Sequence, residues 1–202
     1  FARMFSEGGY EHHLKSWLYV DNHDTERLAY MLPEVASQRL ATLLQFTLPG
    51  SPNLYYGSEL GMNGGGDPEM RAPMRWDWVN DQNETLAWHR KLIEMHNSHR
   101  ALRVGDFRLV ETEKLMGYER YTDRAADTVV VLINPTDETV SEQVLVANSK
   151  LMNGCFMIDQ LTGERITIWC GMLPVTLKPQ SALVLVPETT PAGGYSSYKR
   201  VQ

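Results

Sequence analysis

Trp17-Leu-Tyr-Val-Asp-Asn-His-Asp-Thr-Glu-Arg27 is the stretch that decides the fold. Its apolar start ends abruptly in Asn22, His23 and Asp24. Apolar residues followed at once by polar ones indicate a strand, over 16–20, whose C-terminal end delivers side chains into a site. An imidazole beside a carboxylate can bind hydroxyl groups and stabilise a developing positive charge, so the triplet is the first candidate site.

The segments after this strand alternate in type. Pro33 and the apolar spacing behind it predict a helix over 33–48, and 52–56 reads as a second short strand. Glycines, prolines and charges predict an irregular loop over 61–78. A last helix is capped by Asn83 or Thr85 and runs to about residue 99. Strand–helix–strand–helix order predicts parallel strands with helices outside. On the last helix we expect Leu86, Leu92 and Ile93 to form the inner face. The three histidines of this helix are expected to face solvent: His89, His96 and His99.

Beyond residue 100 the pattern changes to short strands separated by Gly, Asn, Asp and Pro. This pattern predicts an antiparallel sandwich or barrel. The tail over 189–202 is expected to be flexible. The eight predicted strands are 106–111, 115–121, 128–133, 142–147, 155–159, 165–170, 173–177 and 182–186.

Composition excludes several classes of partner. The 202 residues suit one large or two small domains, with 43% hydrophobic and 22% charged residues. A net charge of −6 with scattered Lys and Arg argues against nucleic acid. No apolar run approaches the ~20 residues of a membrane helix. Because the chain begins at Phe1 without a signal-peptide pattern, we expect a fragment or processed product, and localisation stays open between cytoplasmic, periplasmic and secreted.

The two cysteines lie symmetrically about a candidate hairpin turn. A two-residue turn at Thr162 and Gly163 would place Cys155 opposite Cys170. The alternative is two half-buried thiols, because a register slip of one residue would separate them. The sequence leaves open whether they are bonded.

Three segments in order carry a family resemblance. The Asn22–Asp24 triplet and its flanks resemble the Asn-His-Asp motif of glycoside hydrolase family 13, the α-amylase family, after its seventh barrel strand. The segment 49–62 resembles the family's eighth strand and following turn. The segment Asp67-Pro-Glu-Met-Arg-Ala-Pro-Met-Arg-Trp76 resembles a substrate-side loop of the neopullulanase and cyclomaltodextrinase branches.

The resemblance implies a fold. Residues 1–100 would be the last strand–helix units of a (β/α)₈ TIM barrel, and residues 101–188 an antiparallel β-sandwich. A full barrel takes about 250 residues and closes on itself. Two units leave open strand edges, so we expect the missing barrel portion, a partner or self-association to cover them.

The resemblance also implies roles. Asp24 matches the family's transition-state-stabilising aspartate, and His23 its sugar-binding histidine, while Asn22, Asp67 and Arg71 would contact an α-glucan. The purely structural alternatives are an interior histidine for His23, a helix cap for Asp24, and a loop-internal ion pair between Asp67 and Arg71.

The bond-breaking groups are expected elsewhere. The Gly-x-Arg-x-Asp pattern of the family's nucleophile is absent. Gly117-Tyr-Glu-Arg120 is no substitute for it, because this segment lies on a predicted strand in the β-rich half. The chain alone is therefore expected to be inactive, as part of a longer retaining glycosidase. No cofactor is evident, no metal-ligand spacing is found, and any calcium would lie in missing parts. The alternatives are a non-catalytic carbohydrate-binding or structural module, or a transporter-associated relative. Linkage preference, and hydrolysis against sugar transfer, stay open.

Six nearby residues have secondary expectations. Arg27 is expected to be structural and to orient carboxylates. Tyr55 and Tyr56 should point to opposite sides of a strand. Glu59 should pack in the turn. Trp76 and Trp78 are either a stacking platform for sugar rings or loop anchors.

Overall fold

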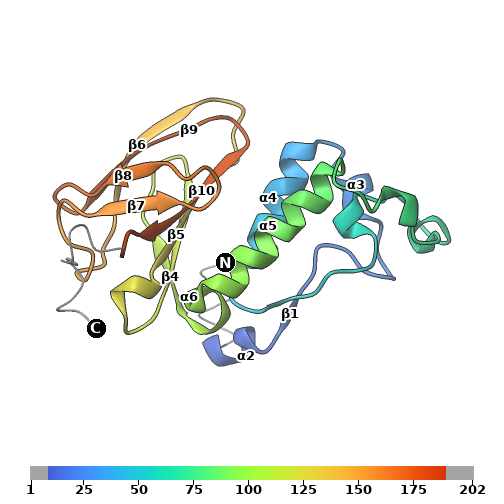
Figure 1. The fold of residues 1–202 in the computed structure, drawn as a ribbon, viewed down its shortest axis with the longest axis horizontal. Helices are drawn as coiled ribbons and strands as arrows, with labels where there is room; N and C mark the ends of the chain where they lie inside the picture. Colours follow the sequence, from blue (N-terminus) through green and yellow to red (C-terminus); the bar gives the residue numbers. More distant parts are fainter. Residues whose placement is uncertain (1–8, 190–202) are drawn as a thin grey trace. The chain divides into compact units, whose positions relative to one another are not determined.

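The computed structural model describes residues 9–189, and the predicted flexible tail lies outside them apart from Thr189. The chain divides between Ser98 and His99 into two compact units, which we call the N-terminal and C-terminal units. Each unit is described by itself (Figure 1).

The N-terminal unit contains a two-stranded parallel sheet. Strand β1 (Trp17–Leu18) pairs with β2 (Ser51–Pro52), which confirms the predicted parallel arrangement. Both strands are shorter than the predicted 16–20 and 52–56. At the C-terminal end of the sheet, Gln45 Nε2 donates to the carbonyls of Leu18 and Asn53. The helices and 3₁₀ turns of this unit are α2 (Tyr10–Leu14), α3 (Leu28–Met31), α4 (Val35–Thr47), η1 (Ser58–Leu60), η2 (Glu69–Arg71), η3 (Trp76–Trp78) and α5 (Glu84–Ser98).

Helices α4 and α5 pack against each other and run side by side in Figure 1. The indole Nε1 of Trp88 on α5 donates to Thr42 Oγ1 on α4 at 3.0 Å. Helix α4 starts two residues after Pro33, within the predicted span. Asn83 caps α5, because its Oδ1 accepts the backbone N–H of Leu86 at 3.0 Å. The open choice between Asn83 and Thr85 is thereby decided.

The inner face of α5 differs from the prediction. Its buried positions recur every three residues, at Leu86, His89, Leu92 and Met95. Ile93 is next to Leu92 and therefore turned about 100° away, and it is 39% exposed. His89 is buried, which contradicts its predicted solvent-facing position. His96 is half-buried, with Nδ1 2.9 Å from the carbonyl oxygen of Phe46.

The C-terminal unit consists mainly of antiparallel strands in two sheets. The larger sheet has the order β3-β4-β5-β10-β7-β8, and β6 pairs with β9. All eight predicted strands are present, with ends shifted by up to three residues. Their bounds are β3 (Asp106–Val110), β4 (Met116–Tyr121), β5 (Val129–Asn134), β6 (Val140–Leu145), β7 (Phe156–Asp159), β8 (Arg165–Thr167), β9 (Met172–Leu177) and β10 (Ser181–Pro187), accompanied by α6 (Arg100–Val104) and η4 (Ala125–Asp127).

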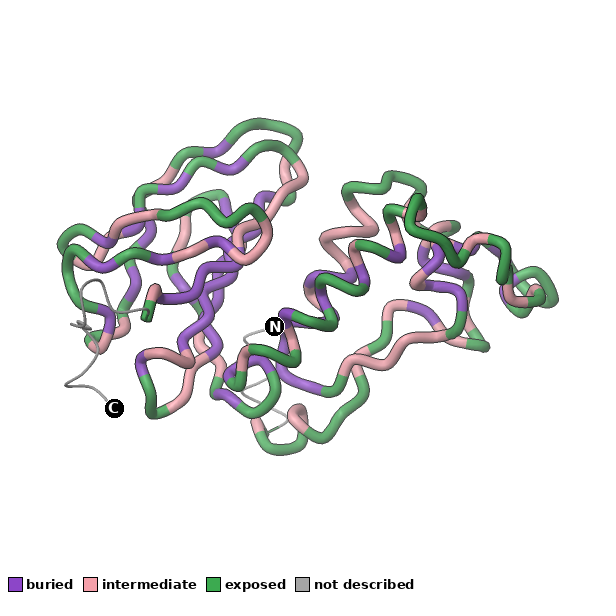
Figure 2. Tube along the Cα trace, viewed as in Figure 1, coloured by how far each residue is buried: buried purple, intermediate pink, exposed green. Residues whose placement is uncertain are grey.

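Both sheets contribute side chains to one hydrophobic core. Every residue of the central strand β5 is buried, whereas β9 alternates buried and exposed residues (Figure 2). Val130 and Leu132 of the larger sheet share a cluster with Val144 and Leu173 of the smaller one. An alternating strand with one face on a core is typical of antiparallel sheets.

The cysteine hairpin has a different register from the one predicted. Phe156 pairs with Thr167, so Cys155 lies beside Ile168 rather than opposite Cys170. The turn is longer than two residues because the carboxylate of Asp159 accepts the backbone N–H groups of Leu161 and Thr162. Cys155 is buried, Cys170 is exposed, and no disulfide joins them.

Within residues 9–189, no helix has both the length and the apolar composition needed to cross a membrane.

Candidate functional site

The turn after β1 presents His23 and Asp24 outward. Asn22 forms this turn: its Oδ1 accepts the backbone N–H of Asp24 at 2.8 Å, and its own N–H donates to Thr25 Oγ1 at 3.0 Å. Asparagine stabilises such turns because its side chain mimics a backbone carbonyl. The side chains of His23 and Asp24 are 67% and 69% exposed, with His23 Nε2 3.2 Å from Asp24 Oδ2.

Neither the helix-cap role for Asp24 nor the interior position for His23 is found in this structure. Helix α3 starts at Leu28 and follows Arg27, with no side-chain cap, so Asp24 caps no helix. His23 is exposed rather than an interior histidine. The carboxylate and the imidazole therefore point to solvent beside each other.

Arg71 brings the second predicted motif onto this turn. Its Nε donates to the backbone carbonyl of His23 at 3.0 Å. The same guanidinium lies 3.6 Å from Asp24 Oδ1 and 3.7 Å from Asp67 Oδ1. His23, Asp24, Asp67 and Arg71, called the site cluster below, thus meet although their motifs are far apart in the sequence.

The parallel sheet explains why these motifs meet. The turn with Asn22 follows the C-terminal end of β1, and the loop with Arg71 follows that of β2. Parallel strands place their C-terminal ends on the same edge, so the segments that follow them converge. The ion pairs of the site cluster are exposed and contribute roughly 0–1 kcal/mol each to stability. Their carboxylates and guanidinium stay accessible to a ligand.

Beneath the site cluster, Arg27 joins three segments. Its side chain is fully buried, and it donates from Nε to the carbonyl of Met70 at 2.7 Å and from Nη1 to that of Tyr56 at 2.6 Å. Its backbone N–H donates to the carbonyl of Gly64 at 2.9 Å. The predicted structural role is confirmed, but the hydrogen-bond acceptors are backbone carbonyls rather than carboxylates.

The two tyrosines pack on Arg27 together. The guanidinium carbon is 4.1 Å from the ring centroid of Tyr55 and 4.8 Å from that of Tyr56. The prediction that they point to opposite sides is wrong, because β2 ends at Pro52 and strand alternation no longer applies. Tyr56 Oη donates to the carbonyl of Ala72, which holds the loop with Arg71. Desolvation, followed by the hydrogen bond with Tyr56, raises the pKa of Tyr55.

Asp21 is a residue that sequence reasoning missed. It is 2% exposed and accepts hydrogen bonds from the backbone N–H of Leu28 at 2.9 Å and from Ser58 Oγ at 2.7 Å. A buried carboxylate is tolerated only with such donors. It fastens the turn of Asn22 to α3 and η1. The available signal was an acidic residue directly between the apolar run and the triplet.

The two tryptophans of the loop have different surroundings. Trp76 is 75% exposed, so its ring face is open to solvent. Trp78 is half-buried and packs against the cluster of Leu60, Met62 and Leu86, with the Arg75 guanidinium 4.4 Å from its ring centroid. Trp78 therefore anchors the loop, and Trp76 alone is available for stacking. Glu59 is partly buried within η1, after β2.

Across residues 9–189, no group of three or more His, Cys, Asp or Glu side chains has an arrangement that could hold a metal ion.

Comparisons with known proteins agree on one family. The α-amylase model, described as the alpha amylase catalytic domain, matches residues 4–122. A cyclomaltodextrinase of Geobacillus thermopakistaniensis (strain MAS1) is 33% identical over 173 residues, which cover 84% of this chain and 29% of the relative. Neopullulanase 2 of Thermoactinomyces vulgaris is 32% identical over 171 residues, with 84% and 29% covered. The structure of an α-amylase from Geobacillus thermoleovorans complexed with acarbose has a TM-score of 0.74 at 27% identity, covering 90% of this chain and 42% of that chain.

Two of the solved structures that this chain resembles are α-amylases, one from Anoxybacillus and one from Geobacillus thermoleovorans. The chain belongs to the α-amylase family. It spans 29% of the length of the cyclomaltodextrinase and of the neopullulanase.

Proposed function

We propose that this chain forms one wall of the active site of an α-glucan hydrolase. Family membership supports the reaction class, and the names of the relatives, cyclomaltodextrinase and neopullulanase, support starch-like glucans and cyclomaltodextrins as substrates. Cleavage would follow the retaining mechanism, in which one carboxylate attacks and another carboxyl protonates the leaving oxygen.

One observation carries the proposal. Arg71 contacts the carbonyl of His23 and the carboxylates of Asp24 and Asp67, so it joins both motifs into one exposed cluster. Two carboxylates, a guanidinium and an imidazole offer fixed donors and acceptors to the hydroxyls of a sugar. Exposed ion pairs add little stability, so a ligand-binding role accounts for their grouping better than folding does.

Asp24 is the transition-state stabiliser in this proposal. Glycoside cleavage develops positive charge at the sugar ring. A carboxylate held in place near that charge stabilises the transition state more than the ground state, which raises the rate. Asn22 holds Asp24 in place because its Oδ1 accepts the backbone N–H of Asp24, and Arg71 flanks the Asp24 carboxylate. His23 donates a hydrogen bond to the same sugar.

Asp67 and Arg71 bind neighbouring glucose units, and Asn22 shapes the turn that faces them. Trp76, with its exposed ring, is placed in the loop of these residues and suits stacking on a sugar. The nucleophile and the general acid come from outside the site cluster, since the chain lacks the family motifs that carry them, including Gly-x-Arg-x-Asp.

The same proposal assigns the two units. Residues 1–100 are the end of a (β/α)₈ barrel, supported by the parallel pairing of β1 with β2 and by a cluster beyond their C-terminal ends. Residues 101–188 are a β-sandwich, supported by two antiparallel sheets that share one core.

A turnover comparison tests the proposal. The 202-residue chain and a polypeptide that joins it to the rest of a family barrel are assayed on maltooligosaccharide and on cyclomaltodextrin. We expect hydrolysis by the joined polypeptide and none by the chain alone. Robust hydrolysis by the pure chain would contradict the division of labour, and an inactive joined polypeptide that binds glucan would favour a non-catalytic binding module.

A further inference from the structure

His89 on α5 is a buried histidine with one ring nitrogen unsatisfied. The residue is 2% exposed, and its Nδ1 lies 2.8 Å from the carbonyl oxygen of Thr85. Because a carbonyl oxygen only accepts, Nδ1 carries the proton, and Nε2 is left as an acceptor. Nε2 is buried and has no hydrogen-bond partner among the described residues. A buried polar atom of this kind is costly unless something donates to it.

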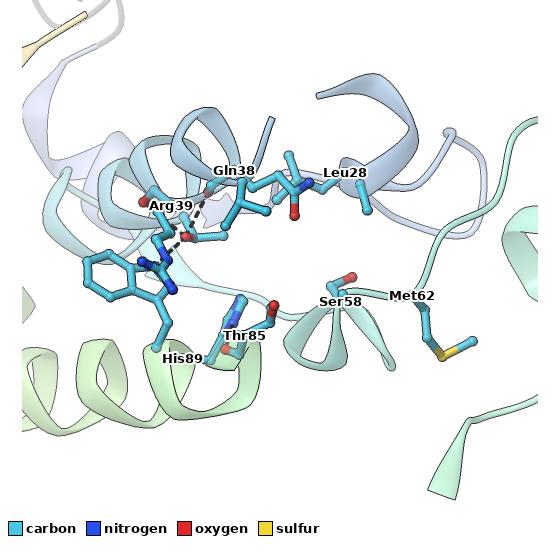
Figure 3. A pocket seen from close by; sticks show the side chains of 12 residues that line it. Leu28, Gln38, Arg39, Ser58, Met62, Thr85 and His89 are labelled. Carbon is cyan, nitrogen blue, oxygen red and sulfur yellow. Dashed lines mark hydrogen bonds between the residues drawn. The ribbon is translucent and has the colours of Figure 1, made fainter. Parts of the chain in front are cut away.

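His89 lines a small cavity within the N-terminal unit. Figure 3 shows His89 and Thr85 of α5 on one side, Ser58 and Met62 beside them, and Gln38 and Arg39 of α4 across the space. The cavity has a volume of about 10 Å³. That is about the smallest volume that holds one water.

Ser58 supplies a second polar group in the cavity wall. Its Oγ donates to Asp21 Oδ1 at 2.7 Å, so its lone pairs are available to accept. We propose that the cavity binds one water molecule, which donates one hydrogen to His89 Nε2 and the other to Ser58 Oγ. This water links α5 to Asp21. Its binding does not depend on the proposed glucan-hydrolase function.

The charges around the cavity suit a neutral donor. Desolvation lowers the pKa of His89 from its usual 6.5, although the hydrogen bond with the Thr85 carbonyl and the carboxylates of Glu59 and Asp21 oppose this shift. Burial therefore favours the neutral imidazole. Arg39 also lines the cavity, but its guanidinium is paired with Glu84 at 3.0 Å. A neutral imidazole with a free lone pair takes a hydrogen-bond donor such as water.

The link reaches the turn that carries the site cluster. Asp21 accepts from Ser58 and from the backbone N–H of Leu28, and it directly precedes Asn22. The bound water therefore lets His89 constrain Asp21 through Ser58. His89 is a positioning residue for the turn, since it acts through other groups.

The test uses the 202-residue chain. A crystal structure is expected to show one water within hydrogen-bond distance of His89 Nε2 and Ser58 Oγ, and NMR a water-to-ring cross-peak at His89. Ser58→Ala should abolish the cross-peak with the Nδ1–H tautomer kept. His89→Leu should shift the backbone amide signals of Asn22 and Leu28, whereas His96→Leu on the same helix should leave them in place.

Three results would overturn the inference. The first is a protein group, rather than water, bonded to Nε2. The second is a cross-peak that survives Ser58→Ala, which would break the proposed bridge. The third is a folded His89→Leu variant with unshifted Asn22 and Leu28 amides. Should His89→Leu fail to fold, His89→Phe and the Ser58→Ala cross-peak decide the matter.

Discussion

Arg71 donates a hydrogen bond from Nε to the backbone carbonyl of His23, 48 residues earlier in the chain, at 3.0 Å. This bond joins the loop after β2 to the turn after β1. Because the acceptor is a backbone atom, it fixes the path of the turn and leaves the His23 imidazole available. The same guanidinium flanks Asp24, so one side chain both shapes and charges the proposed site.

Removing this side chain should weaken substrate binding. In a barrel-complete polypeptide, Arg71→Ala is expected to raise KM for maltooligosaccharide about tenfold or more, the equivalent of about 1.4 kcal/mol. Arg71→Lys should recover part of the loss, because an ammonium keeps the charge but not the planar donors. Arg75→Ala is the matched control, since Arg75 lies in the same loop and pairs with Asp77 instead. Equal effects of Arg71→Ala and Arg75→Ala would argue against a binding role for Arg71.

Arg27 should matter for stability instead. Arg27→Met removes two hydrogen bonds to carbonyls, one buried and one partly buried, and takes their donor away. We expect the free energy of unfolding to fall by about 3 kcal/mol or more, at about 1.5–3 kcal/mol for each hydrogen bond to a charged group. Denaturant unfolding measures this change. The exposed Arg90, paired with Asp81 at 3.5 Å, gives the control, and Arg90→Met should cost roughly 0–1 kcal/mol. Similar losses for both variants would count against the role of Arg27.

His89 should make stability depend on pH. Its folded pKa is lowered from 6.5, mainly by desolvation, so below about pH 6.5 the unfolded chain binds more protons than the folded one. The titration of His89 therefore leaves the free energy of unfolding unchanged above about pH 6.5. Below that pH it lowers the free energy of unfolding, by up to about 1.4 kcal/mol per pH unit. Unfolding at pH 7.5 and pH 5.5 should show a steeper loss for the native chain than for His89→Gln. The same slope in both proteins would contradict this assignment.

Asn83 should stabilise the start of α5. Its Oδ1 accepts the N–H of Leu86, and its Nδ2 donates to the carbonyls of Leu60 and Trp78. Asn83→Ala is expected to lower the free energy of unfolding by about 1 kcal/mol or slightly more. Asn97→Ala, at an exposed position near the other end of α5, serves as the comparison. No loss on Asn83→Ala would mean that the cap contributes nothing.

Local patterns in the sequence predicted the order of the main helices and strands. The family resemblance named the residues that meet in the site cluster, and their roles stay a prediction. The polar triplet after an apolar run, Pro33 before α4 and Asn83 before α5 are signals that neighbouring residues alone produce. The motif with Asp67 and Arg71 added the second half of the site cluster. Parallel pairing followed from element order, and strand positions in the C-terminal unit from turn residues.

The misses share a physical cause, which is contact between distant segments. Asp21 and His89 are buried by residues from other elements, so the position of each beside apolar neighbours did not by itself establish its burial. The cysteine register depends on how Asp159 caps its turn, and the short ladder of β1 and β2 depends on where each strand finds a partner. Trp78 is less exposed than Trp76 because it packs against Leu60 and Met62, which are distant in the sequence.

The most direct test of the account concerns Asp24 in a barrel-complete polypeptide. Asp24→Asn keeps the shape of the side chain and removes its charge. We expect kcat to fall about 10²–10³-fold with little change in KM, as for loss of a group that acts mainly in the transition state. Asp81→Asn, an exposed carboxylate outside the site cluster, should leave kcat unchanged. A kcat for Asp24→Asn equal to that of Asp81→Asn would contradict the role of Asp24 as transition-state stabiliser.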